Sequence, residues 1–281
     1  MKTGLVLEGG AMRGLFTAGV LDAFLEEGIS FDGIVGVSAG AAFGCNLKSR
    51  QKGRVLRYNT KFCRNPRYCS FRSLALTGDL YGRKFCYEEL PERLDPFDWE
   101  AWENDPTPFW VTCTHVKSGE ARYFLCDQDR KRTMDIFCAS ASMPLVSRKV
   151  MIDGEAYLDG GLADSIPLGF MESRGFEKNL VILTQPREYR KESSSALSLV
   201  SLRYGKKSGL YRCMENRHRH YNAQREEIFR REKEGRAFVL APEEPLPVGR
   251  IEKDAEKLRL AHKIGYQTAK AQMAAIKEFL K

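Results

Sequence analysis

A serine lies between two glycines in the segment Gly36-Val37-Ser38-Ala39-Gly40. An apolar run precedes this segment and small residues follow it, which indicates a sharp turn from a strand into a helix. A serine at such a turn is typical of a nucleophile elbow, where the hydroxyl is exposed at the carboxyl end of a sheet. Gly36 and Gly40 suit the turn because any side chain there would collide with the crossing strand or helix. A tight turn with an inert serine is the alternative.

A glycine-rich loop lies one helix before the serine. Residues 9–14, Gly-Gly-Ala-Met-Arg-Gly, follow a short apolar segment and open a helix. Such a loop can bind phosphate through its N–H groups. However, Ala11 breaks the dinucleotide-binding spacing and no Lys-Ser/Thr pair follows. An oxyanion hole is the other interpretation, with the N–H groups of Gly10 and Ala11 directed toward Ser38. The pairing of loop and serine favours the oxyanion hole.

A serine hydroxyl needs a base that takes its proton. No histidine sits on a recognisable strand-end loop downstream of an acid, in the Ser–Asp–His order of α/β-hydrolases, and His218 and His220 are expected to face solvent from a helix. Asp159 instead ends an apolar strand, where a carboxylate would project from the sheet edge. A carboxylate is a weak base, but burial would raise its basicity. We therefore expect a Ser38–Asp159 dyad, with an ordinary strand-end turn as the alternative for Asp159.

In their order along the chain, these motifs resemble those of the patatin-like phospholipases. The motifs are residues 9–14, 36–40 and Asp159-Gly160-Gly161, and the block Ala139-Ser140-Ala141-Ser142-Met143-Pro144 is similar to a fourth motif of the family. The resemblance covers about residues 3–185. It implies an α/β fold of three α/β/α layers with a mainly parallel central sheet. It also implies acyl-ester hydrolysis by a Ser–Asp dyad, with no metal and no cofactor.

The resemblance implies a role for each motif residue. Ser38 would be the nucleophile and Asp159 the base, while Arg13 would help to fix the oxyanion loop. The remaining site residues are Gly9, Gly10, Ala11 and Gly14 for the oxyanion hole, Gly36 and Gly40 for the elbow, and Gly160 and Gly161 beside the base. Ala11 departs from the family, which often has a third glycine there. A methyl group is tolerated at this position if φ is negative.

The order of predicted elements agrees with a parallel sheet. A strand at 3–7, a helix ending near Gly28 and a strand at 33–37 form a βαβ unit, so the elbow follows the second strand. Further strands are expected at 109–114, 121–126, 150–152, 156–158, 179–184 and 237–241, and a helix at 252–280. The chain is predicted to be a single domain, residues 1–281. Its parts are a core at about 3–185, a basic cap-like insert at about 51–106 and a basic, helical extension at about 187–281.

Charge is concentrated in two parts of the 281-residue chain, whose formal net charge is +8. Residues 51–90 hold nine basic and three acidic residues, and residues 187–234 hold thirteen and seven. These segments are interpreted either as solvated helices or as surfaces that contact anionic membrane. The overall excess is too moderate to indicate nucleic acid as a partner. The sequence does not predict an oligomeric state.

Apolar segments and cysteines bear on where the protein is located and on whether it binds a metal. The first residues lack the apolar core of a secretory signal, and no apolar run is long enough to span a membrane. The sequence therefore predicts a cytoplasmic protein that can contact the membrane peripherally. Its eight cysteines contain no Cys-x-x-Cys pair, so they are expected to be reduced thiols and no metal site is predicted.

These observations predict a serine esterase or lipid acyl hydrolase of the phospholipase A type. Its substrate would be a lipid or small ester, cleaved through an acyl-Ser38 intermediate. Two alternatives remain open. The same dyad could pass the acyl group to an alcohol as a transacylase, or the protein could be a lipid-binding regulator with weak or vestigial hydrolase activity.

Overall fold

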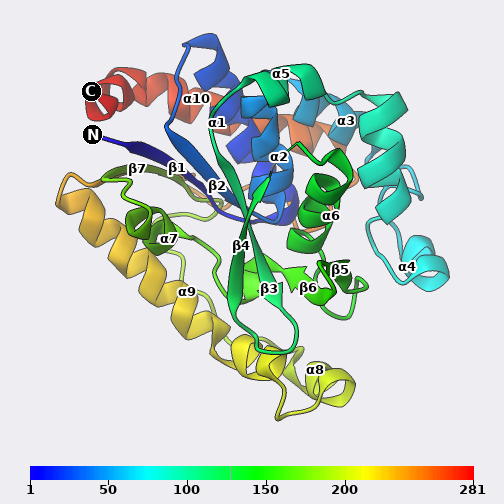
Figure 1. Cartoon of the computed structure of the whole chain (residues 1–281). Coiled ribbons are helices and arrows are strands. Elements are labelled where there is room, and N and C mark those ends of the chain that lie inside the picture. Colours follow the sequence, from blue (N-terminus) through cyan, green and yellow to red (C-terminus); the bar gives the residue numbers. More distant parts are fainter. Residues whose placement is uncertain (127) are drawn as a thin grey trace.

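A mainly parallel sheet of eight strands forms the centre of the protein (Figure 1). The computed structural model of the protein describes residues 1–126 and 128–281. The strand order is β5-β6-β3-β2-β1-β7-β8, with β4 paired to β3. β3, β2, β1, β7 and β8 run parallel, whereas β4, β5 and β6 pair in antiparallel fashion. The strands are β1 (Thr3–Leu7), β2 (Gly33–Val37), β3 (Phe109–His115), β4 (Ala121–Cys126), β5 (Val150–Ile152), β6 (Glu155–Asp159), β7 (Lys178–Ile182) and β8 (Ala237–Leu240).

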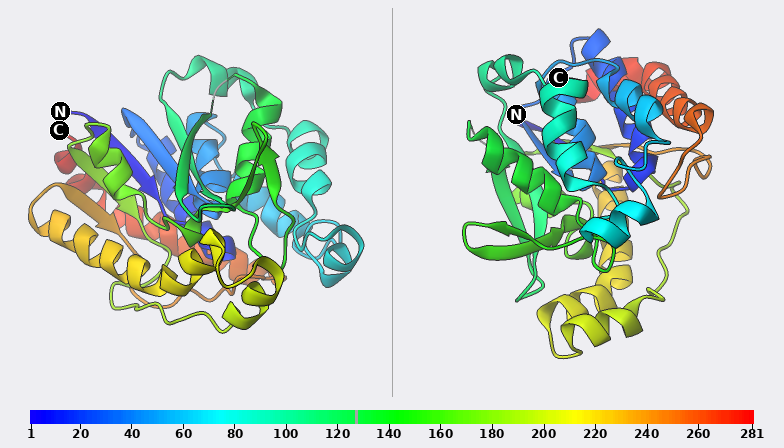
Figure 2. Two further views of the ribbon diagram at one scale, coloured as in Figure 1. Left: turned by 60° about the horizontal axis from the view of Figure 1, so that its bottom comes forward. Right: turned by 90° about the vertical axis from the view of Figure 1, so that its right-hand side faces the viewer.

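Helices cover both faces of this sheet, which confirms the predicted α/β fold (Figure 2). The helices of one face are α1 (Gly14–Glu26), α2 (Ala39–Lys48) and α10 (Ala255–Leu280), and those of the other are α7 (Leu168–Ser173) and α9 (Gly209–Lys233). The other helices are α3 (Arg54–Phe62), α4 (Phe71–Thr77), α5 (Trp99–Asn104), α6 (Arg130–Ser140) and α8 (Leu197–Tyr204). Shorter or irregular turns are η1 (Ala11–Arg13), the π-helical η2 (Phe85–Leu94) and η3 (Gly160–Leu162).

Strand β1 shows how the sequence builds two cores. Leu5 and Leu7 belong to the hydrophobic core beneath α1, α2 and α10, whereas Val6 belongs to the core beneath α7 and α9. This follows from the alternation of side chains along a strand, which places neighbouring residues on opposite faces of the sheet. Because both faces are covered, β2 is apolar and buried along its whole length.

Helix α10 packs closely against α1 through glycines. A Cβ atom added to Gly19 would lie 2.0 Å from the carbonyl oxygen of His262, and one added to Gly265 would lie 1.9 Å from that of Phe16. His262 also contacts Asp22 through Nε2 at 2.7 Å. The last helix is therefore part of the packed structure, and the two termini lie close together (Figure 2).

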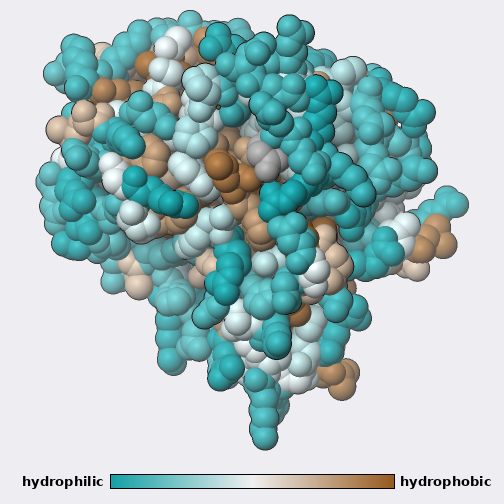
Figure 3. Space-filling model, viewed as in Figure 1, coloured by the Kyte–Doolittle hydropathy of each residue, from teal (hydrophilic) through white to brown (hydrophobic). Residues whose placement is uncertain are grey.

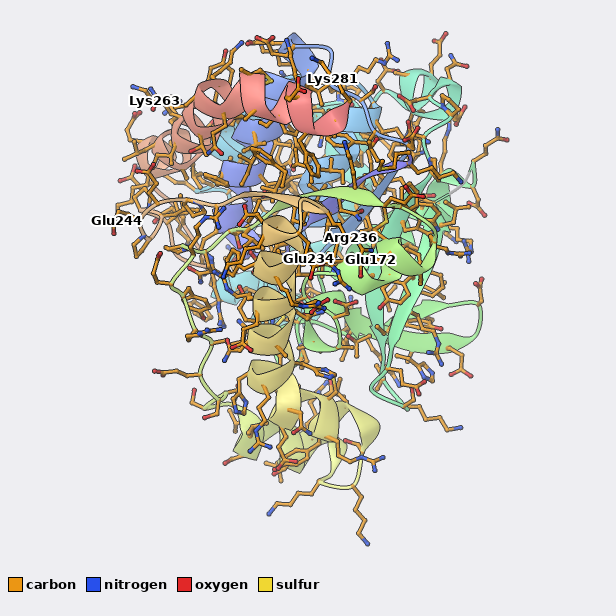
Figure 4. The ribbon with its side chains drawn as sticks, turned by 90° about the vertical axis from the view of Figure 1, so that its left-hand side faces the viewer. Glu172, Glu234, Arg236, Glu244, Lys263 and Lys281 are labelled. Atoms are coloured by element: carbon orange, nitrogen blue, oxygen red, sulfur yellow. The ribbon has the colours of Figure 1, made fainter. Side chains whose placement is uncertain are left out.

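Helix α9 is attached to the opposite face by ion pairs as well as apolar contacts. Figure 4 shows Glu172 of α7, Glu234 and Arg236 gathered at its carboxyl end. Arg231 of α9 bridges two of them, with Nε 2.6 Å from Glu172 and Nη1 3.2 Å from Glu234. Arg236 lies 3.2 Å from Glu172. These contacts help to hold the long helix against the sheet.

Strand β3 brings the carboxyl ends of β2 and β6 together. β4 pairs along one edge of β3, and β2 occupies the first part of the other edge, with Val37 opposite Thr112. β6 runs in the opposite direction along the rest of that edge, with Asp159 opposite Cys113. The turn after Val37 and the end of β6 therefore meet at neighbouring positions of one strand.

Residues 51–106 contain α3, α4, η2 and α5. Aromatic side chains of this segment are buried, among them Tyr58, Phe62 and Phe85. That residues 51–106 act as a cap, and that the whole chain forms a single domain, stay predictions. In the described part of the chain, no helix has both the length and the apolar composition needed to cross a membrane.

Candidate active site

Ser38 occupies a strained turn between β2 and α2. Its backbone has φ of 54° and ψ of −123°, a conformation that non-glycine residues seldom adopt. A Cβ atom added to Gly36 would lie 2.6 Å from Cα of Ala41, and one on Gly40 would lie 2.5 Å from the carbonyl oxygen of Leu7. Both positions therefore require glycine, as the geometry of a nucleophile elbow demands.

Ser38 and Asp159 are in direct contact. The Ser38 hydroxyl donates a hydrogen bond of 2.7 Å from Oγ to Oδ2 of Asp159. The other carboxylate oxygen, Oδ1, accepts a bond of 2.8 Å from the Gly161 N–H. Burial raises the pKa of Asp159 above its usual value, although the Ser38 hydroxyl and the positive charge of Arg217 act in the opposite direction. A raised pKa makes this carboxylate a better proton acceptor than an exposed aspartate.

The glycines after Asp159 allow two backbone segments to pass closely. A Cβ atom on Gly160 would lie only 2.0 Å from the carbonyl oxygen of Thr112 in β3. The hydroxyl of Thr114 donates to the carbonyl oxygen of Asp159 at 2.8 Å. The carboxylate is therefore held on a rigid strand end rather than on a loose loop.

The glycine-rich loop lies beside the elbow. A Cβ atom on Gly9 would lie 2.9 Å from Cβ of Ser38. Within the described residues, the N–H groups of Gly10 and Ala11 make no hydrogen bond to another protein group, which leaves them available to an anion. Gly14 begins α1 at close range to Phe43 of α2, where its own Cβ would lie 2.9 Å from the ring.

Ala11 does not have the negative φ that would let its methyl group be tolerated without strain. Its φ is +50°, in the left-handed region, rather than negative. An alanine in this region costs about 1–2 kcal/mol of backbone strain, which a glycine would avoid. The loop therefore keeps a strained conformation beside the reactive serine.

Glu8 anchors the start of this loop, a role that the sequence analysis missed. The buried carboxylate accepts hydrogen bonds of 2.5 Å from the Thr184 N–H and 2.5 Å from the Tyr221 hydroxyl. It thereby links the ends of β1 and β7 to α9. The sequence signal that could have revealed this role is the position of Glu8, an acidic residue at the end of an apolar strand and immediately before the glycines.

The block at residues 139–144 supports both members of the dyad. The Ser140 hydroxyl accepts from the N–H of Ser38 at 2.8 Å and donates to the carbonyl oxygen of Thr112 at 2.7 Å. The carbonyl oxygen of Ser142 accepts from the N–H of Asp159 at 2.8 Å. The sequence identified this block without a role, and the structure places it as the common support of Ser38 and Asp159.

Helix α9 contributes side chains that the sequence analysis placed in solvent or overlooked. Arg217 donates from Nε to the carbonyl oxygen of Gly161 at 2.5 Å. His218 lines the cavity above the dyad and has a buried Nδ1, so the prediction that it faces solvent is wrong; His220 is exposed. Arg217 could have been found because it shares one helical stripe with the buried residues Leu210, Met214, Tyr221, Arg225 and Ile228.

Arg13 lies in the same cavity. Its Nε is buried and has no hydrogen-bond partner in the described residues. Among the described residues, no side-chain hydrogen bond from Arg13 to the glycine loop supports the predicted fixing role.

A cavity of about 840 Å³ contains the dyad and opens to the surface. Part of its lining is apolar and comes from the segment that carries α2, α3, η2 and α6; this part includes Phe43, Tyr58, Tyr87, Leu90, Phe137 and Met143. The described residues include no group of three or more histidine, cysteine, aspartate or glutamate side chains placed to hold a metal ion. All eight cysteines are free thiols.

Comparison with known proteins gives two family matches. The model of the family described as patatin-like phospholipase matches residues 5–171, which is more than half of the chain. A second model, described as a domain of unknown function (DUF6363), matches residues 207–281. The boundary of the second match falls just before α9.

One curated relative and one solved structure are also similar. The uncharacterized protein YjjU of Escherichia coli strain K12 is 30% identical over 201 residues, which cover 66% of this chain and 53% of that protein. The chain thus spans about half the length of the curated relative that it matches. The crystal structure of VipD from Legionella pneumophila is 12% identical with a TM-score of 0.48, covering 98% of this chain and 67% of that one.

Proposed function

The chain belongs to the patatin-like phospholipase family, and from this premise we propose that it hydrolyses the acyl esters of lipids through an acyl-Ser38 intermediate. The observation that carries the proposal is the hydrogen bond of 2.7 Å from the Ser38 hydroxyl to Asp159. It joins a half-buried hydroxyl at an elbow to a buried carboxylate. That pairing is the minimum needed for nucleophilic catalysis.

The proposed reaction has two steps. Ser38 Oγ attacks the acyl carbon while its proton passes to Oδ2 of Asp159, and the alcohol then leaves with that proton. In the second step Asp159 takes a proton from water, and the resulting hydroxide cleaves the acyl-serine. Ser38 recovers its proton from Asp159, and the fatty acid is released.

Both steps pass through a tetrahedral oxyanion. The N–H groups of Gly10 and Ala11 are the proposed donors, because they lie in the loop that touches Ser38 and have no other partner in the described residues. Gly9 and Gly14 let the loop approach the elbow and α2. One such donor is typically worth about 2.7–4 kcal/mol of barrier.

Substitution of the dyad tests this function. Ser38→Ala and Asp159→Asn should each lower kcat for p-nitrophenyl butyrate and for phospholipid by roughly 10²–10⁴-fold, because each removes the nucleophile or its base. Circular dichroism should show both variants folded. Retention of full activity by either variant would refute the dyad.

Assays with added glycerol distinguish hydrolysis from acyl transfer. They compare the amount of free fatty acid released with the amount of acylglycerol formed, and a dominant acylglycerol product would make the protein a transacylase.

Peripheral contact with anionic membrane is part of the same proposal, as is a cytoplasmic location. The ion pairs of the basic residues bear on which surface could make this contact. Of the basic residues in 51–90, several are neutralised by partners, such as Arg57 by Asp95 and Arg83 by Asp135. In 187–234 the exposed residues Arg203, Lys206 and Lys207 form no ion pair with any described residue. Exposed basic residues without an ion pair among the described residues also occur in 51–90, such as Arg72 and Lys84; the region around α8 is the one that we propose for membrane contact.

A further inference from the structure

Four basic side chains converge on the cavity that contains Ser38. They are Arg13 of η1, Lys191 of the loop before α8, Arg217 of α9 and Arg250 of the loop before α10. The lining from α2, α3, η2 and α6 is largely apolar, and its one charged member, Arg54, is paired with Asp95. Apolar residues such as Met12, Met214 and Ile251 also line the cavity beside the cations. The cavity therefore has a mainly apolar part and a part in which apolar and cationic side chains occur together.

None of the four has a carboxylate partner. Among the described residues, no aspartate or glutamate oxygen lies within ion-pair distance of Arg13, Lys191, Arg217 or Arg250. Three carboxylates line the cavity, those of Glu8, Asp159 and Glu192; Glu192 forms no ion pair with a described residue, and the other two are already engaged. Asp159 accepts from Ser38 and Gly161, and Glu8 accepts from Thr184 and Tyr221. Elsewhere in the chain, cavity-lining arginines do have partners, as Arg190 does in Glu226 at 3.0 Å.

The scaffold holds these cations in place despite their mutual repulsion. Arg217 is fixed by its bond to the Gly161 carbonyl. Lys191 Nζ lies 4.3 Å from the centre of the Tyr221 ring, and Asn222 binds both the N–H and the carbonyl of Lys191, at 2.9 and 3.0 Å. Burial, together with the charge of Arg217, lowers the pKa of Lys191 to about 8. A bound anion would relieve this repulsion and give Arg13 Nε a partner.

We propose that Arg13, Lys191, Arg217 and Arg250 form an anion subsite that binds the phosphate of an acyl-ester substrate whose carbonyl lies at Ser38. The inference rests on the proposed hydrolase function and adds a substrate class to it. The acyl chain would occupy the apolar part of the cavity, and the phosphate would contact the cations. Phosphate is the ligand that matches several convergent guanidinium and ammonium groups.

Matched substrates test the subsite. A 1-acylglycerol and the corresponding 1-acylglycerol 3-phosphate, with the same short acyl chain and both monomeric, differ only in the phosphate. We expect the wild type to prefer the phosphate by about tenfold or more in kcat/KM, since hydrogen bonds to charged groups are worth that much. Lys191→Met and Arg250→Gln should bring this ratio close to one. Arg219→Gln removes an exposed charge from α9 outside the cavity, and its ratio should equal that of the wild type.

Inorganic phosphate distinguishes a lipid phosphate from a free anion. At constant ionic strength it should inhibit p-nitrophenyl butyrate hydrolysis competitively, and Lys191→Met should weaken that inhibition about tenfold. Inhibition without a preference for the phosphorylated substrate would show a site for free phosphate and would overturn the proposal. The proposal would also be overturned if the ratio of kcat/KM for the phosphorylated and unphosphorylated substrates were the same in the wild type and in Lys191→Met. A wild-type protein that shows no Ser38-dependent ester cleavage at all is a separate result, because that outcome refutes the hydrolase function itself.

Discussion

Asp159 is the residue whose ionisation controls the proposed reaction. Its carboxylate is buried, which raises its pKa, while Ser38, Arg217 and Arg250 all favour the charged form. Only the ionised carboxylate can accept the serine proton. The structure therefore connects the pH at which the enzyme works to the burial of Asp159 and to the charges of Arg217 and Arg250.

This connection predicts a pH profile. As pH falls, Asp159 takes up a proton and kcat/KM for the neutral ester p-nitrophenyl butyrate should drop, with a midpoint above the ordinary value of 3.8. Arg250→Gln removes a positive charge that lowers this pKa, so the midpoint should move to higher pH. A midpoint at or below the ordinary value, or a shift to lower pH in the variant, would contradict this account of Asp159.

At the residue scale the sequence predicted Ser38 and Asp159 but missed their supports. The glycines around each residue reveal the turns, because close backbone contacts leave a local mark in the sequence. Ser140, Glu8 and Arg217 leave weaker signals in the sequence, which do not reveal what these residues support, since their partners lie far away along the chain. His218 was misplaced for the same reason: which face of α9 covers the cavity depends on packing.

At the scale of elements, the register of β3 brings the dyad together. β2 ends opposite Thr112 and β6 ends opposite Cys113, on the same edge of β3. The sequence predicted each of these strands with nearly correct bounds. It could not predict that β6 would run antiparallel toward the end of β2, because strand pairing between distant segments is not encoded in local periodicity.

The close contact at Gly160 tests this arrangement. Gly160→Ala would place a methyl carbon 2.0 Å from the carbonyl oxygen of Thr112, so the strands must separate. We expect the free energy of unfolding, measured with urea, to fall by about 1–3 kcal/mol and esterase activity to fall with it.

Gly169→Ala is the matched control. No atom lies within 4 Å of a Cβ added at Gly169, which is exposed in α7. Alanine also favours the helix, so stability should stay equal or rise by up to about 1 kcal/mol. Equal stability of the two variants would contradict the close contact between η3 and β3.

At the scale of the whole molecule, two small helices each carry exposed hydrophobic side chains. Figure 3 shows a largely hydrophilic face with hydrophobic atoms protruding at α4 and α8. They include Phe71 and Leu76 of α4, exposed by 75% and 73%, and Leu199 and Leu202 of α8, exposed by 60% and 86%. Helix α8 directly follows the cavity-lining residues 189–196 and precedes Lys206 and Lys207, which form no ion pair within 1–126 and 128–281. Hydrophobic and basic groups thus occur together near the cavity.

This surface predicts how the protein contacts lipid. The double variant Leu199→Ser/Leu202→Ser should bind anionic vesicles about tenfold more weakly in a flotation assay, because burial of each leucine contributes roughly 1.5–3 kcal/mol at most. Cleavage of soluble p-nitrophenyl butyrate should be unchanged. Leu260→Ser, which alters an exposed leucine of α10, is the control. Equal vesicle binding by all three proteins would exclude α8 as a contact surface.

The central claim is that Ser38 is an activated nucleophile, and covalent labelling tests it most directly. After treatment with a fluorophosphonate probe, mass spectrometry of the digested protein should show one adduct, on the peptide that contains Ser38. Ser38→Ala should give no adduct and Asp159→Asn should react much more slowly. An unlabelled wild-type protein, or a Ser38→Ala variant labelled elsewhere that still cleaves esters, would contradict the account.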